Sequence, residues 1–442
     1  MSVDPGFFIH ESDKAALDTL KSIPGFTPFI KGFMKVWNEK QFRILNLSSR
    51  LRVSEEQLPK YHRMLVPICE KLGIAVPELY IELNVQPNAY TYGDNEPFIV
   101  LTSGLIETMP EELIPTVLAH ECGHIVCHHT LYTTMGSVIM AGAAALSGLG
   151  SLISLPLQYA FAYWMRCSEF SADRAAIVYD GTPDKMVEVC MRFAGLDQRI
   201  NDYASKEVFL KQAEEYRQFV KDDAWNQTLE TLILANQRHP LTAIRAYEAD
   251  VWGKTEDFLK IRLYLAEEEA GTDHEYVPMT FSAEGCIGKD VSEVRSRFEK
   301  AGIGNITMNR IMDGDPGLRC DQVTAVAVED QPGFPEYSWL RKNSRITLTY
   351  YSPYSSEEVR SRFPGKVRIP ESYSYCIGKN AYDVYKAFTS SGFTNVTAER
   401  QKSGRPLFAR DEEIVRVTIN GTSRFEKGEL AEESDPVVIY YW

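Results

Sequence analysis

Apolar residues recur at helical spacing over most of residues 12–265, and short strand-like runs interrupt them at a few places. The runs 79–83 and 98–102 are rich in aliphatic and aromatic residues and are bounded by proline or polar residues, which predicts strands. The helical pattern resumes at Pro110, where proline and two acidic residues suit the first turn of a helix. We therefore predict a mainly helical domain with a small β-sheet over residues 1–265.

The remainder of the chain repeats itself with an offset of 90 residues. Residues 266–278 are charged and poor in apolar side chains, which is typical of a linker. Residues 279–351 and 372–442 each show one helical stretch followed by three strand-like runs, so we predict one helix on a three-stranded sheet, twice. Residues 352–371 are predicted to be a second linker, although residues 358–363 repeat the sequence EVRSRF of the first copy. The predicted fold class is α+β multidomain. Identical pairs include Cys286 and Cys376, Ile287 and Ile377, Gly288 and Gly378, Lys289 and Lys379, Val294 and Val384, Phe298 and Phe388, and Arg310 and Arg400.

Each copy resembles the PASTA domain in its Gly-Lys turn, in the helix after that turn, and in the strand pairs after the helix. The resemblance covers about 70 residues per copy. It implies two small α/β modules that bind the substrate, another ligand or a protein partner.

Composition narrows the class of protein. The formal net charge is −14, which argues against a nucleic-acid partner because phosphate contacts need clustered basic residues. The chain begins without a signal-peptide pattern and its eight cysteines form no disulfide framework, so we expect a cytoplasmic location. Residues 136–157 carry no charge and are about half Gly, Ala and Ser, and we expect a buried or surface-docked helical hairpin there. The alternative for this run is a membrane contact that would place the protein at the membrane periphery.

Four of the eight histidines lie between residues 120 and 129, and two of them form the sequence His120-Glu-Cys-Gly-His124. On a helix, residues four apart share one face, so both imidazoles can bind a single Zn²⁺. Glu121 lies beside that face, where it can hold a water molecule and accept its proton. His128 would lie on the same face one turn further along. We interpret it as a supporting polar group, with the alternative of a fourth metal ligand that would close the water position.

A catalytic zinc site needs a third protein ligand, and the segment 166–176 offers one. Glu169 and Asp173 are again four residues apart on a predicted helix. We therefore predict His120, His124 and Glu169 as ligands of one Zn²⁺ per chain, with Asp173 orienting a ligand histidine.

These motifs resemble the zinc metallopeptidase family that contains the CAAX prenyl endopeptidases and the HtpX-type heat-shock proteases. The resemblance covers about residues 50–250 and implies a gluzincin-type fold. It also implies that His239 donates to the oxyanion of the tetrahedral intermediate and that Arg245 supports His239. The matching sequences are HECGH at 120–124, SEFSADRAA at 168–176, RHP at 238–240 with Arg245, NAY at 88–90 and FIVLTSGL at 98–105.

The predicted function is a zinc metalloendopeptidase that hydrolyses a peptide or protein substrate by attack of an activated water, with Glu121 as the base. We expect the peptide to pair with the strand of residues 98–102 as an added edge strand. The predicted substrate-binding residues are Asn88, Ala89, Phe98, Val100 and Thr102. Two alternatives remain, namely a non-catalytic scaffold stabilised by metal and a membrane-associated quality-control protease. Glu121 distinguishes the first of them, because a purely structural metal site needs no base.

Overall fold

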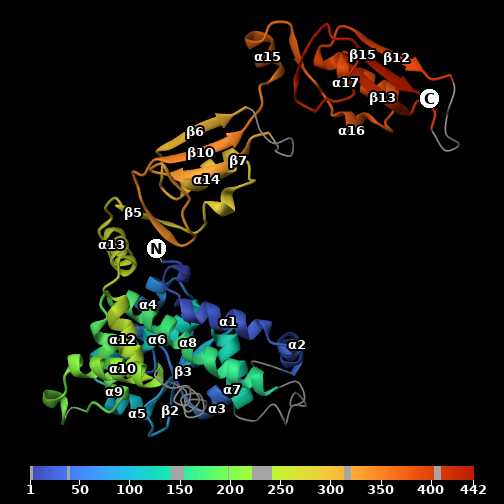
Figure 1. Ribbon diagram of the computed structural model, residues 1–442. Helices are drawn as coiled ribbons and strands as arrows, with labels where there is room; N and C mark the ends of the chain where they lie inside the picture. Colours follow the sequence, from blue (N-terminus) through green and yellow to red (C-terminus); the bar gives the residue numbers. More distant parts are fainter. Residues whose placement is uncertain are drawn as a thin grey trace. The chain divides into compact units, whose positions relative to one another are not determined.

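The computed structural model describes residues 3–36, 40–140, 154–197, 199–221, 241–312, 320–402 and 410–442. It divides into two compact units, Met1–Tyr276 and Val277–Trp442 (Figure 1). Helices dominate the first unit and small sheets dominate the second. The α+β class predicted from the sequence is therefore confirmed.

The first unit is built around α6 (Ile114–Val126) and the long helix α8 (Leu155–Asp180), which lie against each other (Figure 1). Nearly every residue of α6 is buried, because other elements cover it on several sides. The surrounding helices are α1 (Glu11–Ser22), α2 (Phe26–Val36), α3 (Lys40–Ser49), α4 (Pro59–Leu72), α5 (Ser103–Thr108), α7 (Thr130–Met140), α9 (Asp184–Phe193), α10 (Lys206–Lys221), α12 (Thr242–Trp252) and α13 (Glu256–Ala270).

The sheet of the first unit has the strand order β1 (Leu51–Val53), β2 (Glu78–Glu82), β4 (Phe98–Thr102), β3 (Ala89–Tyr92). Strand β4 is buried along its whole length, with β2 parallel on one side and β3 antiparallel on the other. The expectation that a peptide adds to the strand of residues 98–102 is therefore wrong. A continuous apolar run is typical of a central strand, whose hydrogen-bonding groups are already used. The edge strand beside β4 is β3.

Helix α6 ends earlier than its histidine-rich sequence suggests. Cys127 caps it, and His128 adopts the left-handed conformation with φ +58°. A left-handed residue directly after a helix reverses the chain direction. His128 is consequently exposed and leaves the face of His120 and His124, so the expectation that it continues that face is wrong.

Of the uncharged run 136–157, residues 141–153 lie outside the described residues. The flanking parts belong to α7 and to the start of α8. In the part of the chain that the structure describes, no helix combines the length and the apolar character needed to cross a bilayer.

The two copies in the second unit share one topology. In the first, α14 (Val291–Lys300) accompanies a sheet in which β10 (Ile346–Tyr351) is parallel to β6 (Ile306–Ile311) and antiparallel to β7 (Gln322–Val328). In the second, α17 (Ala381–Ser391) accompanies β12 (Val396–Arg400), β15 (Val437–Tyr441) and β13 (Ile414–Ile419) in the same arrangement. The first sheet has a short fourth strand, β8 (Gln331–Pro332), in addition to the predicted three. Two further strand pairs are β5 (Tyr276–Met279) with β9 (Ser338–Arg341), and β11 (Lys366–Arg368) with β14 (Leu430–Glu432).

Both segments predicted as linkers contain regular structure. In residues 266–278, α13 continues to Ala270 and β5 begins at Tyr276. Residues 352–371 contain α15 (Ser356–Arg362) as well as β11. Helix α15 forms because Ser355 and Glu358 make a capping box, a pattern present in the sequence but not used in the prediction.

The contact between α6 and α8 depends on Gly123. A Cβ atom at this position would lie 2.8 Å from the Cα of Ala172 and 2.8 Å from the Cβ of Ala175. Glycine and the facing alanines thus let the two helices approach closely, although glycine costs about 1 kcal/mol relative to alanine within a helix.

We expect Gly123→Ala to destabilise the protein despite the better helix propensity of alanine, because the added methyl group meets backbone atoms of α8. Overpacking of this kind costs about 1–3 kcal/mol, measurable by thermal or urea unfolding. Gly304→Ala is the matched control, because nothing lies within 4 Å of a Cβ atom placed there. Stability equal to or above that of the wild type in Gly123→Ala would contradict the close contact.

Candidate metal centre

Two histidines from α6 and one glutamate from α8 converge in the interior of the first unit. The Nε2 atom of His120 lies 3.6 Å from one carboxylate oxygen of Glu169, and the Nε2 atom of His124 lies 3.4 Å from the other. All three side chains are buried, and one ligand atom of each lies within 4.8 Å of the others. Tetrahedral zinc with ligands about 2.0–2.1 Å away places its ligand atoms about 3.4 Å apart. The donor set and its spacing therefore fit a divalent metal ion such as zinc.

Asp173 and Arg245 surround the first of these histidines. Asp173 lies one turn after Glu169 on α8, and its Oδ1 atom is 2.8 Å from Nδ1 of His120. Arg245, from α12, donates to both oxygens of Asp173 at 2.8 and 2.6 Å and lies 2.9 Å from Glu169. Arg245 thus holds two carboxylates of α8, a role that the sequence did not predict for it.

These contacts shift the protonation of the cluster. Burial by itself lowers the pKa of His120, but hydrogen bonds with Asp173 and Glu169 outweigh it and raise this pKa to about 9. Burial raises the pKa of Asp173, and the charge and hydrogen bonds of Arg245, together with those of His120, bring it below its usual value. Burial lowers the pKa of His124. A metal at Nε2 of His120 would replace a proton, because a ligand imidazole must be deprotonated.

Glu121 lies beside the three candidate ligands. Its carboxylate accepts a hydrogen bond of 2.6 Å from the hydroxyl of Thr91, a buried residue on the edge strand β3. Two small cavities of about 20 and 40 Å³ flank Glu121, one lined also by His120 and the other also by His124. A water molecule needs about 10–15 Å³, so each cavity has room for one.

A further buried histidine, His129, contacts the Nδ1 side of the His124 ring, which faces away from Glu169. The Nδ1 atom of His124 is 3.1 Å from Nδ1 of His129, and Nε2 of His129 is 2.8 Å from Asp13 on α1. Asp13 also accepts hydrogen bonds from Trp164 at 2.9 Å and Ser171 at 2.6 Å. The sequence prediction missed this set. Its only signal was an acidic residue on the apolar face of α1, three residues before Ala16.

The predicted substrate-binding residues separate into different environments. Phe98 and Val100 are buried in the core of the sheet, and the hydroxyl of Thr102 caps α5. These three residues lie on the central strand, which excludes backbone pairing with a peptide there, and their assignment to substrate binding stays a prediction. Asn88 donates its backbone N–H to Thr102, while Ala89 lines the cavity beside Glu121. His239 lies outside the described residues.

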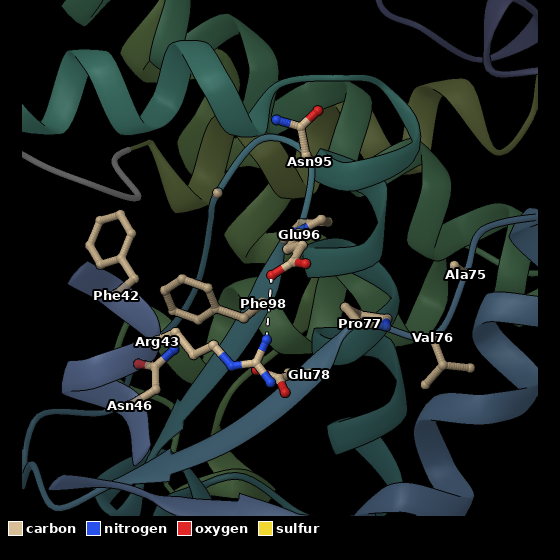
Figure 2. A pocket seen from close by; sticks show the side chains of 12 residues that line it. Phe42, Arg43, Asn46, Ala75, Val76, Pro77, Glu78, Asn95, Glu96 and Phe98 are labelled. Atoms are coloured by element: carbon tan, nitrogen blue, oxygen red, sulfur yellow. Dashed lines mark ion pairs between the residues drawn. The ribbon is translucent and has the colours of Figure 1, made fainter. Parts of the chain in front are cut away.

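A larger cavity of about 300 Å³ lies elsewhere in the first unit. It is lined by residues of α3, of the segment leading into β2, and of the turn between β3 and β4 (Figure 2). Across it, the guanidinium of Arg43 lies 3.7 Å from the carboxylate of Glu96 (Figure 2). None of the candidate metal ligands lines this cavity.

Comparison with known proteins assigns the class. The model of peptidase family M48 matches residues 56–252. The plastoglobule-localized metallopeptidase 48 of Arabidopsis thaliana chloroplasts is 33% identical over 262 residues, which cover 58% of this chain and 75% of that protein. A protease HtpX homolog of Ralstonia nicotianae is 26% identical over 179 residues, covering 35% of this chain and 62% of that protein.

These comparisons place the chain among the metallopeptidases. The chain belongs to peptidase family M48. It is accordingly a hydrolase of peptide bonds, and the resemblance drawn from the sequence motifs is confirmed. Members of this family depend in general on zinc.

The solved structures are less informative. The three-PASTA-domain segment of a Ser/Thr kinase from Staphylococcus aureus matches 38% of this chain and 66% of that structure, with 12% identity and a TM-score of 0.16. A likeness this low supports no argument about fold or binding. The PASTA resemblance therefore stays a prediction.

Asp13 makes the stability of the first unit depend on pH. Burial raises its pKa, but the hydrogen bonds and charge of His129 and the hydrogen bonds of Ser171 and Trp164 lower it below its unfolded value. A carboxyl with a lowered pKa stabilises the fold above its unfolded pKa, and this contribution disappears as the pH falls through the folded pKa.

We expect the free energy of unfolding of the metal-free protein to decrease as the pH drops below about 4. This is the range in which an ordinary aspartate takes up a proton. Urea unfolding followed by tryptophan fluorescence over pH 3–7 measures this free energy, and Asp13→Asn should show a weaker dependence. Asp18→Asn, on the exposed face of the same helix, should retain the wild-type dependence. An identical pH dependence in Asp13→Asn and the wild type would contradict this assignment.

Proposed function

We propose that this chain is a zinc-dependent endopeptidase in which His120, His124 and Glu169 hold one Zn²⁺ and Glu121 is the general base. The observation that carries the proposal is the spacing of the three donors beside a buried carboxylate that is no part of the ligand set. A purely structural site would be closed by a fourth ligand and would need no such base.

The residues around the metal position divide the chemical work. Bound Zn²⁺ would polarise the scissile carbonyl and lower the pKa of a water molecule. Glu121 accepts the proton of the attacking water and returns it to the leaving amine. Thr91 holds one carboxylate oxygen of Glu121, which orients the other. Asp173 holds Nδ1 of His120, so that Nε2 of this ring faces the metal position.

Two further roles are proposed, one from the sequence and one from contacts in the structure. His239 is the proposed donor to the oxyanion of the tetrahedral intermediate. Removing a donor of this type costs about 100–1000-fold in rate. Arg245 is proposed to act on the metal site through Asp173 and Glu169, which both contact its guanidinium.

We propose that the substrate backbone pairs with the outer edge of β3, which no strand among the described residues covers. Thr91 on this strand contacts the proposed base, and Ala89 lines the adjoining cavity. A peptide that extends the sheet at β3 would satisfy backbone groups that the sheet leaves open, and it would pass beside Glu121.

We infer that the two C-terminal copies bind substrate or a partner through different surfaces. Tyr375 and Tyr382 of the second copy are 51% and 66% exposed. The corresponding positions of the first copy are Gly285 and Ser292. Exposed tyrosines are common in binding surfaces because they offer a large, rigid contact area together with a hydroxyl group.

The proposed base has a direct test. We expect purified wild-type protein to contain about one zinc per chain and to cleave casein or a peptide library. Glu121→Gln should retain the zinc and lose about 10²–10⁴-fold in kcat, because it lacks the proton acceptor. Glu112→Gln, an exposed position nine residues upstream, serves as control. Equal cleavage by Glu121→Gln and the wild type would refute the enzymatic assignment.

The hydrogen bond from Thr91 should matter for rate and not for metal binding. A hydrogen bond to a charged group contributes about 1.5–3 kcal/mol, so Thr91→Val should lower kcat by about 10–100-fold at unchanged zinc content. Thr91→Ser keeps the hydroxyl and should restore most of the rate. Thr108→Val removes a hydroxyl that bonds only the carbonyl of Gly104 on α5, and it should leave kcat unchanged. Full activity of Thr91→Val would exclude this orienting role.

A further inference from the structure

We propose that Asp13, acting through His129, is a positioning residue for the metal ligand His124. The inference rests on the proposed zinc site and deepens it. Asp13 lies in the N-terminal helix, upstream of the segment 56–252 that matches the family model. The metal centre would thus depend on a part of the chain that precedes the peptidase motifs.

The three side chains form a continuous buried path. The carboxylate of Asp13 lies 2.8 Å from Nε2 of His129, and Nδ1 of His129 lies 3.1 Å from Nδ1 of His124. On the other side of that ring, Nε2 of His124 faces Glu169 at 3.4 Å. Asp13, His129 and His124 are 2%, 2% and 6% exposed. Water therefore has little access to these nitrogens.

With a metal at Nε2 of His124, that nitrogen carries no proton, and the contacts along this path then fix the remaining protons. An ionised carboxylate accepts hydrogen bonds and cannot donate, so Nε2 of His129 carries a proton. A neutral, metal-bound His124 keeps its proton on Nδ1, so Nδ1 of His129 is the acceptor of that hydrogen bond. This leaves the lone pair of Nε2 of His124 directed at the metal position. The carboxylate thereby selects the tautomer of the ligand through an intervening ring.

The remaining contacts of Asp13 fix it in place. Trp164 donates to one carboxylate oxygen and Ser171 to the other, and both residues lie on α8, the helix that carries Glu169. Ser171 also accepts the backbone N–H of His10 at 3.0 Å. Helix α1 is therefore held against α8 at the level of the metal ligands.

The two ligand histidines are supported differently. His120 meets the carboxylate of Asp173 directly at 2.8 Å. His124 meets a carboxylate on its Nδ1 side only across a second imidazole. Outer partners of metal ligands typically contribute about 10–100-fold in metal affinity. We assign a contribution of this size to the path through His129.

The test compares zinc affinities of four full-length proteins by competition with a chelating dye at one fixed pH. The proteins are wild type, Asp13→Ala, His129→Phe and the double variant. Asp13→Ala should bind zinc about 10–100-fold more weakly. In the double variant, Asp13→Ala should cost little more than His129→Phe alone, because the effect runs through His129. The absorption spectrum of the cobalt-substituted proteins should change in the same variants.

Further variants separate positioning from folding. Thr116→Val removes a hydrogen bond between α6 and Asp180 of α8 that takes no part in this path, so it should lower the unfolding temperature and leave zinc affinity within about threefold. Asp18→Asn, exposed on the same helix as Asp13, should change neither quantity. Asp13→Asn preserves the shape of the side chain. If Asp13→Ala does not fold, the zinc affinity of Asp13→Asn is measured in its place.

The outcomes are distinguishable. Wild-type zinc affinity in the Asp13 variants, or equal costs of Asp13→Ala with and without His129, would overturn the positioning role and leave the proposed zinc site standing. Absence of zinc binding by the wild type would overturn the proposed function itself.

Discussion

The close approach of α6 to α8 is the constraint on which the rest of the first unit depends. With glycine at position 123, two imidazoles of one helix face two carboxylates of the other in a buried interior. Buried charges of this kind must be paired, because leaving one without its partner costs about 3–5 kcal/mol. Arg245 supplies the pairing from α12, and Asp13 supplies a second acceptor from α1. Helices α1, α6, α8 and α12, which are far apart in the sequence, therefore meet at the candidate metal centre.

The part of this centre that could be predicted follows from the geometry of single helices. Residues four apart share a face whatever the tertiary structure is, so the pairs His120 and His124, and Glu169 and Asp173, could be recognised from their spacing. Imidazoles and carboxylates are typical zinc ligands, so these two helix faces together predicted a metal site. The same local reasoning failed at His128, because one left-handed residue ends the helix and its effect is not visible in the periodicity.

Contacts between distant segments could not be predicted in this way. Thr91 precedes Glu121 by thirty positions on a strand without any special motif, and Asp13 is one acid among many. The order of strands was equally hidden, because an apolar run such as 98–102 indicates burial without indicating which neighbours cover it. In the second unit the repeat predicted one topology for both copies, while β8 within the first copy and α15 between the copies were not predicted.

Two equivalent arginines of the second unit bind different partners in the two copies. Arg310 of the first copy donates to both carboxylate oxygens of Glu358 in α15, at 2.6 and 2.9 Å, whereas the equivalent Arg400 pairs with Asp411 of its own copy. Glu358 belongs to the segment that leads into the second copy. The two copies are therefore not equivalent: this arginine of the first copy binds the connecting helix, whereas the corresponding arginine of the second copy binds within its own copy. If the two copies were exchanged in order, the ion pair between Arg310 and Glu358 would be lost. The two copies are therefore not interchangeable.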